Sequence, residues 1–126
     1  MENKNVFNFS NASETSTRYA IQVDFTDAGT SGSTFVVAPH AGTIVGFHAV
    51  NAVANATVKT VLTAKIATVL VTTPAWEVLI TQAAGIASSS VPTANNVVTA
   101  GQVVEILTDG GTSSVMPLRA TIVIAR

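Results

Sequence analysis

Residues 57–72, TVKTVLTAKIATVLVT, decide the fold class, because their apolar side chains fit both a helix and a strand. Val58, Val61 and Leu62 have the spacing of a helical stripe. A strand would place four side chains on one face, namely Val58, Leu62, Ile66 and Leu70. Thr, Val and Ile make up much of the stretch, and β-branched residues favour strands over helices. We therefore predict two strands here, with a bend near Ala67.

Apolar runs before this block predict further strands. Residues 19–25 alternate between apolar and polar types, as a half-buried strand does. TFVVAP at 34–39 predicts a second strand, which ends at Pro39 because proline cannot donate to a ladder. TIVGFHAVNAV at 43–53 predicts a third. On strict alternation, it should present four residues on one face, namely Ile44, Gly46, His48 and Val50.

The second half of the chain predicts shorter strands between turns. Residues 75–81 and 97–108 supply strands, whereas 82–96 show no periodicity and predict a long loop. The segment Asp109-Gly110-Gly111 has the composition of a hairpin turn, and the terminal PLRATIVIAR predicts the last strand. The total is about eight short strands. This spacing is typical of an all-β, antiparallel two-sheet sandwich.

The first 18 residues differ in composition from the rest of the chain. They are polar and rich in Asn and Ser, and they lack the basic and apolar regions of a signal peptide. We interpret 1–18 as an extended N-terminal arm and 19–126 as one β-domain, a suitable size for a single core. The arm is either a frayed terminus or a segment that docks on a neighbouring chain through Val6, Phe7 and Phe9, which have nothing local to pack on.

The charge content excludes several classes of partner. Charged residues make up 10% of the chain and the net charge is −1, which gives no electrostatic basis for binding nucleic acid or an anionic membrane. No apolar run reaches the ~18 residues of a membrane span. The absence of cysteine excludes disulfides and thiol catalysis. With so few charges, either Thr, Ser and Asn solvate the surface or a good part of it is buried between subunits, and we favour burial between subunits.

Four stretches within residues 38–126 resemble the small head decoration (cement) proteins of tailed bacteriophages. They are APHAGTIVGFHAV, the block ending LVTTPAWEVLIT, SVPTANNVVTAGQVVEILTDGG and PLRATIVIAR. The matching positions are Ala38-Pro39, Gly42-Thr43-Ile44, Pro92-Thr93, Asn96, Val98, Ala100-Gly101, Val104 and Ile106. The chain departs from the pattern at Gln102, where an acidic residue is common.

This resemblance implies a jelly-roll sandwich that forms a homotrimer and binds the outer surface of a phage head. The implied partner is the major capsid protein, and the implied location is the virion, after assembly in the host cytoplasm. Contact with the capsid is expected either from the arm, through Val6, Phe7 and Phe9, or from the loop 82–96.

Histidine and aspartate residues are candidates for metal binding, but their spacing does not favour it. His40 and His48 have no obvious third ligand nearby, and zinc needs three or four. Asp24, Asp27 and Asp109 lack the spacing of a calcium loop, and we expect them either to be solvated or to accept hydrogen bonds from local backbone N–H groups. We predict no metal and no cofactor. We expect His48 in a partly buried strand position with a hydrogen-bonded ring nitrogen.

The chain offers no clear catalytic constellation. Glu77 and Glu105 are the candidates for a glycosidase pair, which requires two carboxylates at a defined separation in a cleft. Ser88-Ser89-Ser90 lacks the Gly-x-Ser-x-Gly context of a nucleophile and is expected in a loop. We therefore predict that the protein is not an enzyme. The expected partner of Glu105 is one of three basic residues, Lys59, Lys65 or Arg119, either within the chain or across a subunit boundary.

Two functions remain after these exclusions. The first is a structural decoration protein that reinforces a phage head. The alternative is a trimeric carbohydrate- or receptor-binding β-module of a phage fibre or surface protein. Trp76, the single tryptophan, discriminates between them. An exposed Trp76 beside polar loops would suit a sugar site, whereas a buried Trp76 favours the structural function.

Overall fold

The computed structural model describes residues 17–55, 58–111 and 115–126. These residues form ten strands and no helix, which confirms the all-β prediction. The strands are β1 (Arg18–Phe25), β2 (Gly32–Val37), β3 (Gly42–Asn51), β4 (Thr60–Ile66), β5 (Val69–Leu70), β6 (Glu77–Val78), β7 (Ala87–Ser90), β8 (Val97–Val98), β9 (Val103–Thr108) and β10 (Leu118–Ala125).

The two strands predicted within residues 57–72 are present as β4 and β5. A tight turn separates them at Ala67 and Thr68, whose φ angles are 48° and 73°. Positive φ at two successive residues matches the turn that the right-handed twist of a hairpin favours. The predicted bend near Ala67 is therefore confirmed.

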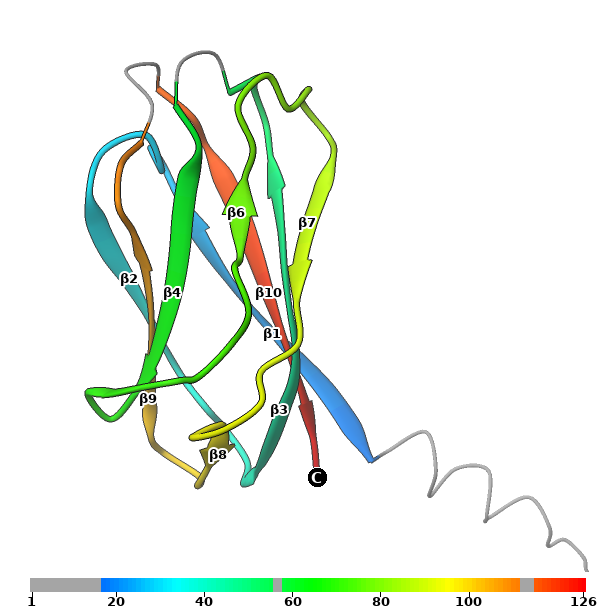
Figure 1. Cartoon of the computed structure of the whole chain (residues 1–126). Helices are drawn as coiled ribbons and strands as arrows, with labels where there is room; N and C mark the ends of the chain where they lie inside the picture. The colour runs from blue at the N-terminus through cyan, green and yellow to red at the C-terminus, as the bar shows by residue number, and fades with distance from the viewer. Residues whose placement is uncertain (1–16, 56–57, 112–114) are drawn as a thin grey trace, which may run out of the picture.

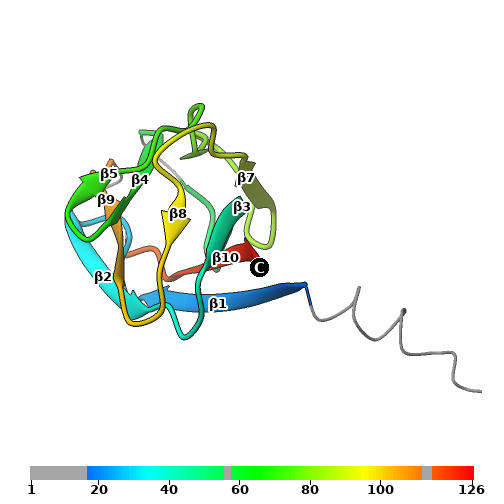
Figure 2. The same cartoon turned by 90° about the horizontal axis from the view of Figure 1, so that it is seen from below.

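Two antiparallel sheets pack face to face as a jelly-roll sandwich (Figure 1). Sheet I has the strand order β1-β10-β3-β7, with β8 also paired to β3. Sheet II has the order β2-β9-β4-β5, with β6 also paired to β4. Figure 2 looks along the strands and shows β2, β9 and β4 on one side, β10, β3 and β7 on the other, and β8 between them at this end.

The core lies between the two sheets and follows the alternation of the strands. In β4, for example, Leu62, Ala64 and Ile66 are buried, while Thr63 and Lys65 point to the outer side. β10 alternates in the same way and contributes four buried residues, Leu118, Ala120, Ile122 and Ile124. Each strand thus gives one face to the core and leaves the other on the outside of the sandwich.

β3 departs from strict alternation because it contains a β-bulge at Val45. Its register against β10 shifts by one residue there. Ile44 consequently lies on the core side together with Phe47, and both side chains are fully buried. The predicted placement of Ile44 on the face of His48 is therefore wrong.

The segment 82–96 is not a continuous loop, contrary to the prediction. Its residues Ala87–Ser90 form β7, which pairs with β3 at the edge of sheet I. Ser88 and Ser90 are buried, and the Ser90 hydroxyl donates to the Pro74 carbonyl at 2.9 Å. Pairing with β3 therefore makes a strand from residues whose own propensity is low.

The turn at Asp109-Gly110-Gly111 does not close a hairpin. β9 belongs to sheet II and β10 to sheet I, so the chain crosses between the sheets after Thr108. The hairpin prediction from DGG is wrong, because local composition indicates a turn without saying which strand pairs next.

The predicted N-terminal arm falls largely outside the described residues. Val6, Phe7 and Phe9 lie in residues 1–16, so their placement and the boundary at residue 18 stay predictions. The described chain enters β1 at Arg18, and the Arg126 N–H donates to the Thr17 carbonyl at 2.6 Å. The start of β1 and the C-terminus therefore lie together at one end of the sandwich (Figure 1).

Candidate interaction surfaces

Trp76 lies immediately before β6 and is 1% exposed. Its ring stacks on Phe47 with 4.9 Å between the ring centroids, and its Nε1 donates to the Ser88 carbonyl at 3.3 Å. Tyr19 is half-buried and packs edge-on against His40, with its hydroxyl donating to the His40 carbonyl. The single Trp and single Tyr thus contribute to the fold rather than to an open stacking platform.

The two histidines are exposed and far from a metal-binding arrangement. The Nδ1 of His48 lies 2.8 Å from the Ser89 hydroxyl on the neighbouring strand β7. The predicted hydrogen bond of His48 is confirmed, but its predicted partial burial is wrong, because its side chain lies on the outer face of sheet I. Within the described residues, no group of three His, Cys, Asp or Glu side chains could hold a metal ion.

Asp27 ties the β1–β2 connection to the segment that precedes β10. Its Oδ1 accepts hydrogen bonds from the N–H groups of Met116 at 3.0 Å and Gly29 at 2.8 Å. Its Oδ2 accepts from the Thr30 hydroxyl at 2.9 Å. The Met116 N–H, followed by the Thr30 hydroxyl, lowers the pKa of Asp27, while desolvation partly opposes this shift. The prediction that this aspartate bonds nearby backbone groups is confirmed.

We expect Asp27→Asn to lower the melting temperature at pH 7, because an amide cannot accept all three hydrogen bonds. The folded-state pKa lies below the ordinary value of 3.8. The carboxylate therefore stabilises the fold above that value, and this stabilisation is lost as pH falls through the folded-state pKa. The difference in melting temperature between wild type and variant, measured by circular dichroism, should therefore become smaller as the pH falls below 3.8. Asp24→Asn, which removes an exposed ion pair, is the control and should change little.

Glu77 and Glu105 do not form a catalytic pair. In register, Glu77 lies opposite Val61 of β4, and Glu105 lies opposite Lys65 of the same strand. Four residues of strand separate these positions by about 13 Å, beyond the ~9.5 Å upper limit for paired glycosidase carboxylates. Glu77 is instead held by Lys59, whose Nζ lies 3.1 Å from Glu77 Oε2.

Glu105 has no ion pair within the described part of the chain. Lys59 pairs with Glu77, and the Arg119 Nε pairs with Asp24 Oδ1 at 2.9 Å. Of the three expected partners, only Lys65 lies next to Glu105, directly opposite on the adjacent strand. Within one chain, Lys59 and Arg119 therefore do not pair with Glu105, and a pair across a subunit boundary stays a prediction.

The outer faces of the two sheets differ in character. That of sheet I is mostly polar or small, with residues such as Gln22, Arg119, His48 and Ser89. That of sheet II carries four exposed large apolar side chains, Phe35, Val37, Leu70 and Val103, here called the outer apolar patch. The sequence did not reveal this patch, because TFVVAP is apolar on both sides of the strand.

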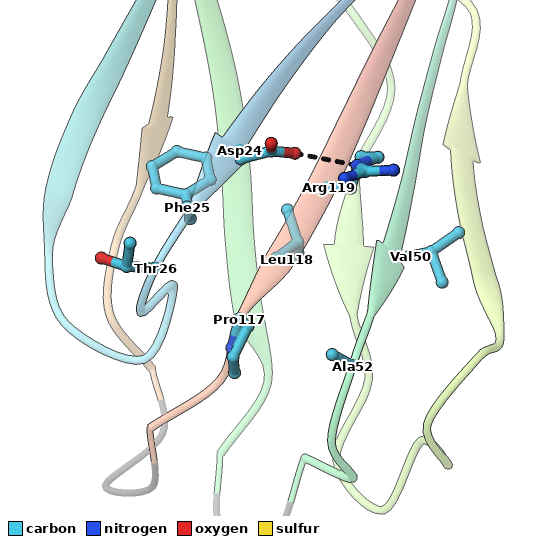
Figure 3. Close-up of a pocket in the computed structure, with 8 residues that line it drawn as sticks. All are labelled: Asp24, Phe25, Thr26, Val50, Ala52, Pro117, Leu118 and Arg119. Atoms are coloured by element: carbon cyan, nitrogen blue, oxygen red, sulfur yellow. Dashed lines mark hydrogen bonds and ion pairs between the residues drawn. The ribbon is translucent and has the colours of Figure 1, made fainter.

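A shallow groove of about 690 Å³ lies at one end of sheet I (Figure 3). Its walls are largely apolar, from Phe25, Val50, Ala52, Pro117 and Leu118. Its only charged side chains, Asp24 and Arg119, form an ion pair with each other and are 63% exposed. The groove therefore lacks the convergent, buried polar groups that a catalytic or sugar-binding site needs.

The β6–β7 connection exposes three large apolar side chains to solvent, those of Leu79, Ile80 and Ile86. Hydrogen bonds hold this connection in place. The side chain of Gln82 joins this loop to its surroundings. Its Nε2 donates to Asn51 Oδ1 at 3.1 Å and to the Ser88 hydroxyl at 3.0 Å, and its Oε1 accepts from the Leu79 N–H at 3.1 Å. This loop lies partly within the segment 82–96, which the sequence singles out for contact with a capsid.

Comparisons with known proteins give only distant structural likenesses. No protein-family model matches the chain, and no curated protein sequence matches it. A chain in the acidic stable capsid structure of Helicobacter pylori bacteriophage KHP30 is 9% identical, with a TM-score of 0.48, and the match covers 87% of this chain and 88% of that one. The sugar-binding EclA C-terminal domain is 10% identical, with a TM-score of 0.45 and coverage of 83% and 78%.

Glycoside hydrolases also match, over a small part of their length. Exo-beta-1,3-galactanase from Phanerochaete chrysosporium is 12% identical, with a TM-score of 0.42, and a GH87 alpha-1,3-glucanase is 14% identical, with a TM-score of 0.46. The matches cover 84% and 85% of this chain but only 26% and 22% of those two. At these identities no residue role transfers. In the described residues, no helix could cross a membrane.

Proposed function

We propose that this protein is a structural decoration protein that binds the outside of a phage head as a homotrimer and stabilises it. The observation that carries the proposal is the division of its apolar side chains. Trp76 and Phe47 are buried in the core, while the large apolar side chains Leu79, Ile80 and Ile86 on the β6–β7 connection remain exposed. Exposed apolar patches on a folded domain are typical of surfaces that bind other proteins.

The sequence resemblance and the fold support the same proposal. The motif positions between residues 38 and 106 lie on a two-sheet jelly roll, as the resemblance implies. In this proposal the major capsid protein is the partner and the virion surface is the location. The sparse charge suits burial between three subunits.

The carbohydrate- or receptor-binding alternative has less support in the geometry. A sugar site commonly presents an exposed aromatic ring beside polar groups. Trp76 is buried and Tyr19 packs against His40, so neither ring is open for stacking on a sugar. The non-enzymatic nature of the protein is part of the same proposal, because Glu77 and Glu105 lie too far apart for paired catalysis.

Binding to particles tests the proposed function. The full chain is mixed with heads of the phage that carries its gene, stripped of bound decoration protein, and the mixture is separated on a density gradient. We expect the chain to sediment with the heads and to raise the temperature at which they rupture. A chain that stays at the top of the gradient, but binds immobilised glycans, would instead support the alternative function.

We expect removal of the arm to weaken assembly while the fold persists. A chain beginning at Thr17 keeps every described strand, so its circular dichroism and melting temperature should stay close to wild type. Burial of the three apolar side chains exceeds the free-energy cost of ordering the arm by a small margin. Loss of the arm should therefore weaken head binding or trimer association roughly tenfold. The measurements are head occupancy on the gradient and the mass by sedimentation equilibrium.

A full-length variant separates the apolar side chains from the length of the arm. It carries Val6→Ser, Phe7→Ser and Phe9→Ser together and should behave like the truncated chain. If both variants match wild type in head occupancy and in trimer dissociation, the arm has no role between chains.

A further inference from the structure

The outer face of sheet II is unusual for an exposed surface. Phe35 is 62% exposed, Val37 54%, Leu70 53% and Val103 42%. Phe35, Val37 and Val103 point away from the core, because the residues that alternate with them on β2 and β9 face inward. Leu70 of β5 lies opposite Lys65, on the outer side of the sheet. No described residue therefore covers the outer apolar patch, and its exposure to water is unfavourable in free energy.

One row of residues crosses this face in register. Phe35 of β2 lies opposite Glu105 of β9, Glu105 lies opposite Lys65 of β4, and Lys65 lies opposite Leu70 of β5. The order across the four strands is therefore apolar, acidic, basic, apolar. Lys65 and Glu105 are half-buried, and neither has an ion pair within the described residues.

We propose that this face binds the same face of a second copy of the chain. The pairing uses a two-fold axis that runs parallel to the strands, midway between β9 and β4. Rotation about this axis reverses the row, so Glu105 faces Lys65 of the second copy and Phe35 faces Leu70 of the second copy. At two of the four positions an acidic side chain then faces a basic one, and at the other two an apolar side chain faces an apolar one. This is the self-complementarity that a two-fold contact requires.

The neighbouring rows are compatible with this arrangement. On one side of the central row, Leu107 of β9 lies opposite Thr63 of β4, so the apolar Leu107 would face the methyl-bearing Thr63 of the second copy. On the other side, Val37 and Val103 extend the apolar surface. No further charged side chain lies in these two rows, so only Lys65 and Glu105 need a partner of opposite charge.

Charge placement favours a second copy over an unrelated protein. The Glu105 and Lys65 side chains of both copies would surround the axis, with acidic and basic groups alternating. Each carboxylate would contact the ammonium group of its own chain and that of the second copy. Sheets that pack face to face keep their strands within about 30°, so the rows stay matched near the axis. Three strands roughly 20 Å long and the two-residue β5, about 4.8 Å apart, bury on the order of 600 Å² in total. An interface of this size is weak and reversible.

This contact goes beyond the proposed function. A two-fold contact joins chains in pairs, whereas a cyclic trimer needs two different surfaces on each chain. If the trimer forms elsewhere on the molecule, face pairing would join trimers and raise the measured mass at high protein concentration. Loss of the face contact would leave trimer mass and head binding intact, so the two proposals fail separately.

The test is a charge swap measured by sedimentation velocity on the full chain over a range of concentrations. Lys65→Glu alone and Glu105→Lys alone each place like charges around the axis, and we expect either to weaken the pairing at least about tenfold. The double variant carrying both changes restores opposite charges at each position. We expect its association to return to within about threefold of wild type.

Two further variants keep the result interpretable. Phe35→Ser removes the largest exposed apolar side chain without touching the core and should also weaken pairing. The matched control swaps the exposed pair on sheet I through Asp24→Arg and Arg119→Asp, and it should leave association unchanged. Melting temperatures confirm that each variant is folded. If wild type shows no concentration-dependent pairing, or if the double variant stays as weak as the single ones, the proposal is wrong.

Discussion

Replacing Trp76 by alanine is expected to lower the free energy of unfolding by about 3–5 kcal/mol, the usual cost of deleting a large buried aromatic ring. The ring is 1% exposed and stacks on Phe47. The variant would leave a cavity between the sheets and remove the donor to the Ser88 carbonyl. A domain of this size is stabilised by only about 5–15 kcal/mol, so the loss is a large fraction of the total.

Trp76→Phe is the matched control for this prediction. It keeps a ring that can stack on Phe47 but removes the Nε1 donor and part of the volume. We expect a smaller loss, on the order of 1–2 kcal/mol. Urea unfolding followed by circular dichroism measures both variants, since neither retains the tryptophan fluorescence. A loss below about 1 kcal/mol for Trp76→Ala would show that the ring is not packed in the core.

Alternation of apolar and polar residues predicts a strand where one face of the strand packs on the core and the other is exposed to solvent. In β1, Val23 and Phe25 are buried while Gln22 and Asp24 are exposed, so the period of two is visible in the residues themselves. The block 57–72 was ambiguous by pattern and was resolved by its β-branched residues. Local chemistry was sufficient in both cases because local and tertiary preferences agree.

Strand pairing decided the features that the sequence did not predict. Ala87–Ser90 form a strand because β3 offers a free edge, and the serine hydroxyls find partners there. The bulge at Val45 inserts one residue against β10, and nothing in the run TIVGFHAVNAV marks its place. Both features depend on residues distant in sequence, which composition and periodicity do not report.

The outer apolar patch was hidden for a related reason. β2 and β9 carry apolar residues on both faces, so alternation does not tell which of Phe35 and Val36 faces the core. The row that joins Phe35 to Leu70 crosses β2, β9, β4 and β5, of which only β4 and β5 are consecutive in the chain. Only the strand order brings Lys65 beside Glu105, although both residues were candidates for pairing from the sequence.

Asp109-Gly110-Gly111 shows how a turn signal can be right about conformation and wrong about topology. Gly110 has a φ of +73°, as the composition suggests, but the chain leaves it for the opposite sheet. The position also sits tightly against the β1–β2 connection. A Cβ on Gly110 would lie 2.2 Å from the Ser31 nitrogen and 2.8 Å from the Thr30 carbonyl carbon.

Gly110→Ala should therefore cost far more stability than Gly101→Ala. Both glycines have positive φ, +73° and +88°, so each substitution incurs the ~1–2 kcal/mol of a left-handed L-residue. At Gly101 nothing lies within 4 Å of the new Cβ, whereas at Gly110 the obstacle is backbone, which cannot rotate away. Overpacking adds about 1–3 kcal/mol there, for a total of roughly 2–5 kcal/mol. Urea unfolding followed by Trp76 fluorescence measures both, and equal losses would show that Gly110 is not in close contact with the β1–β2 connection.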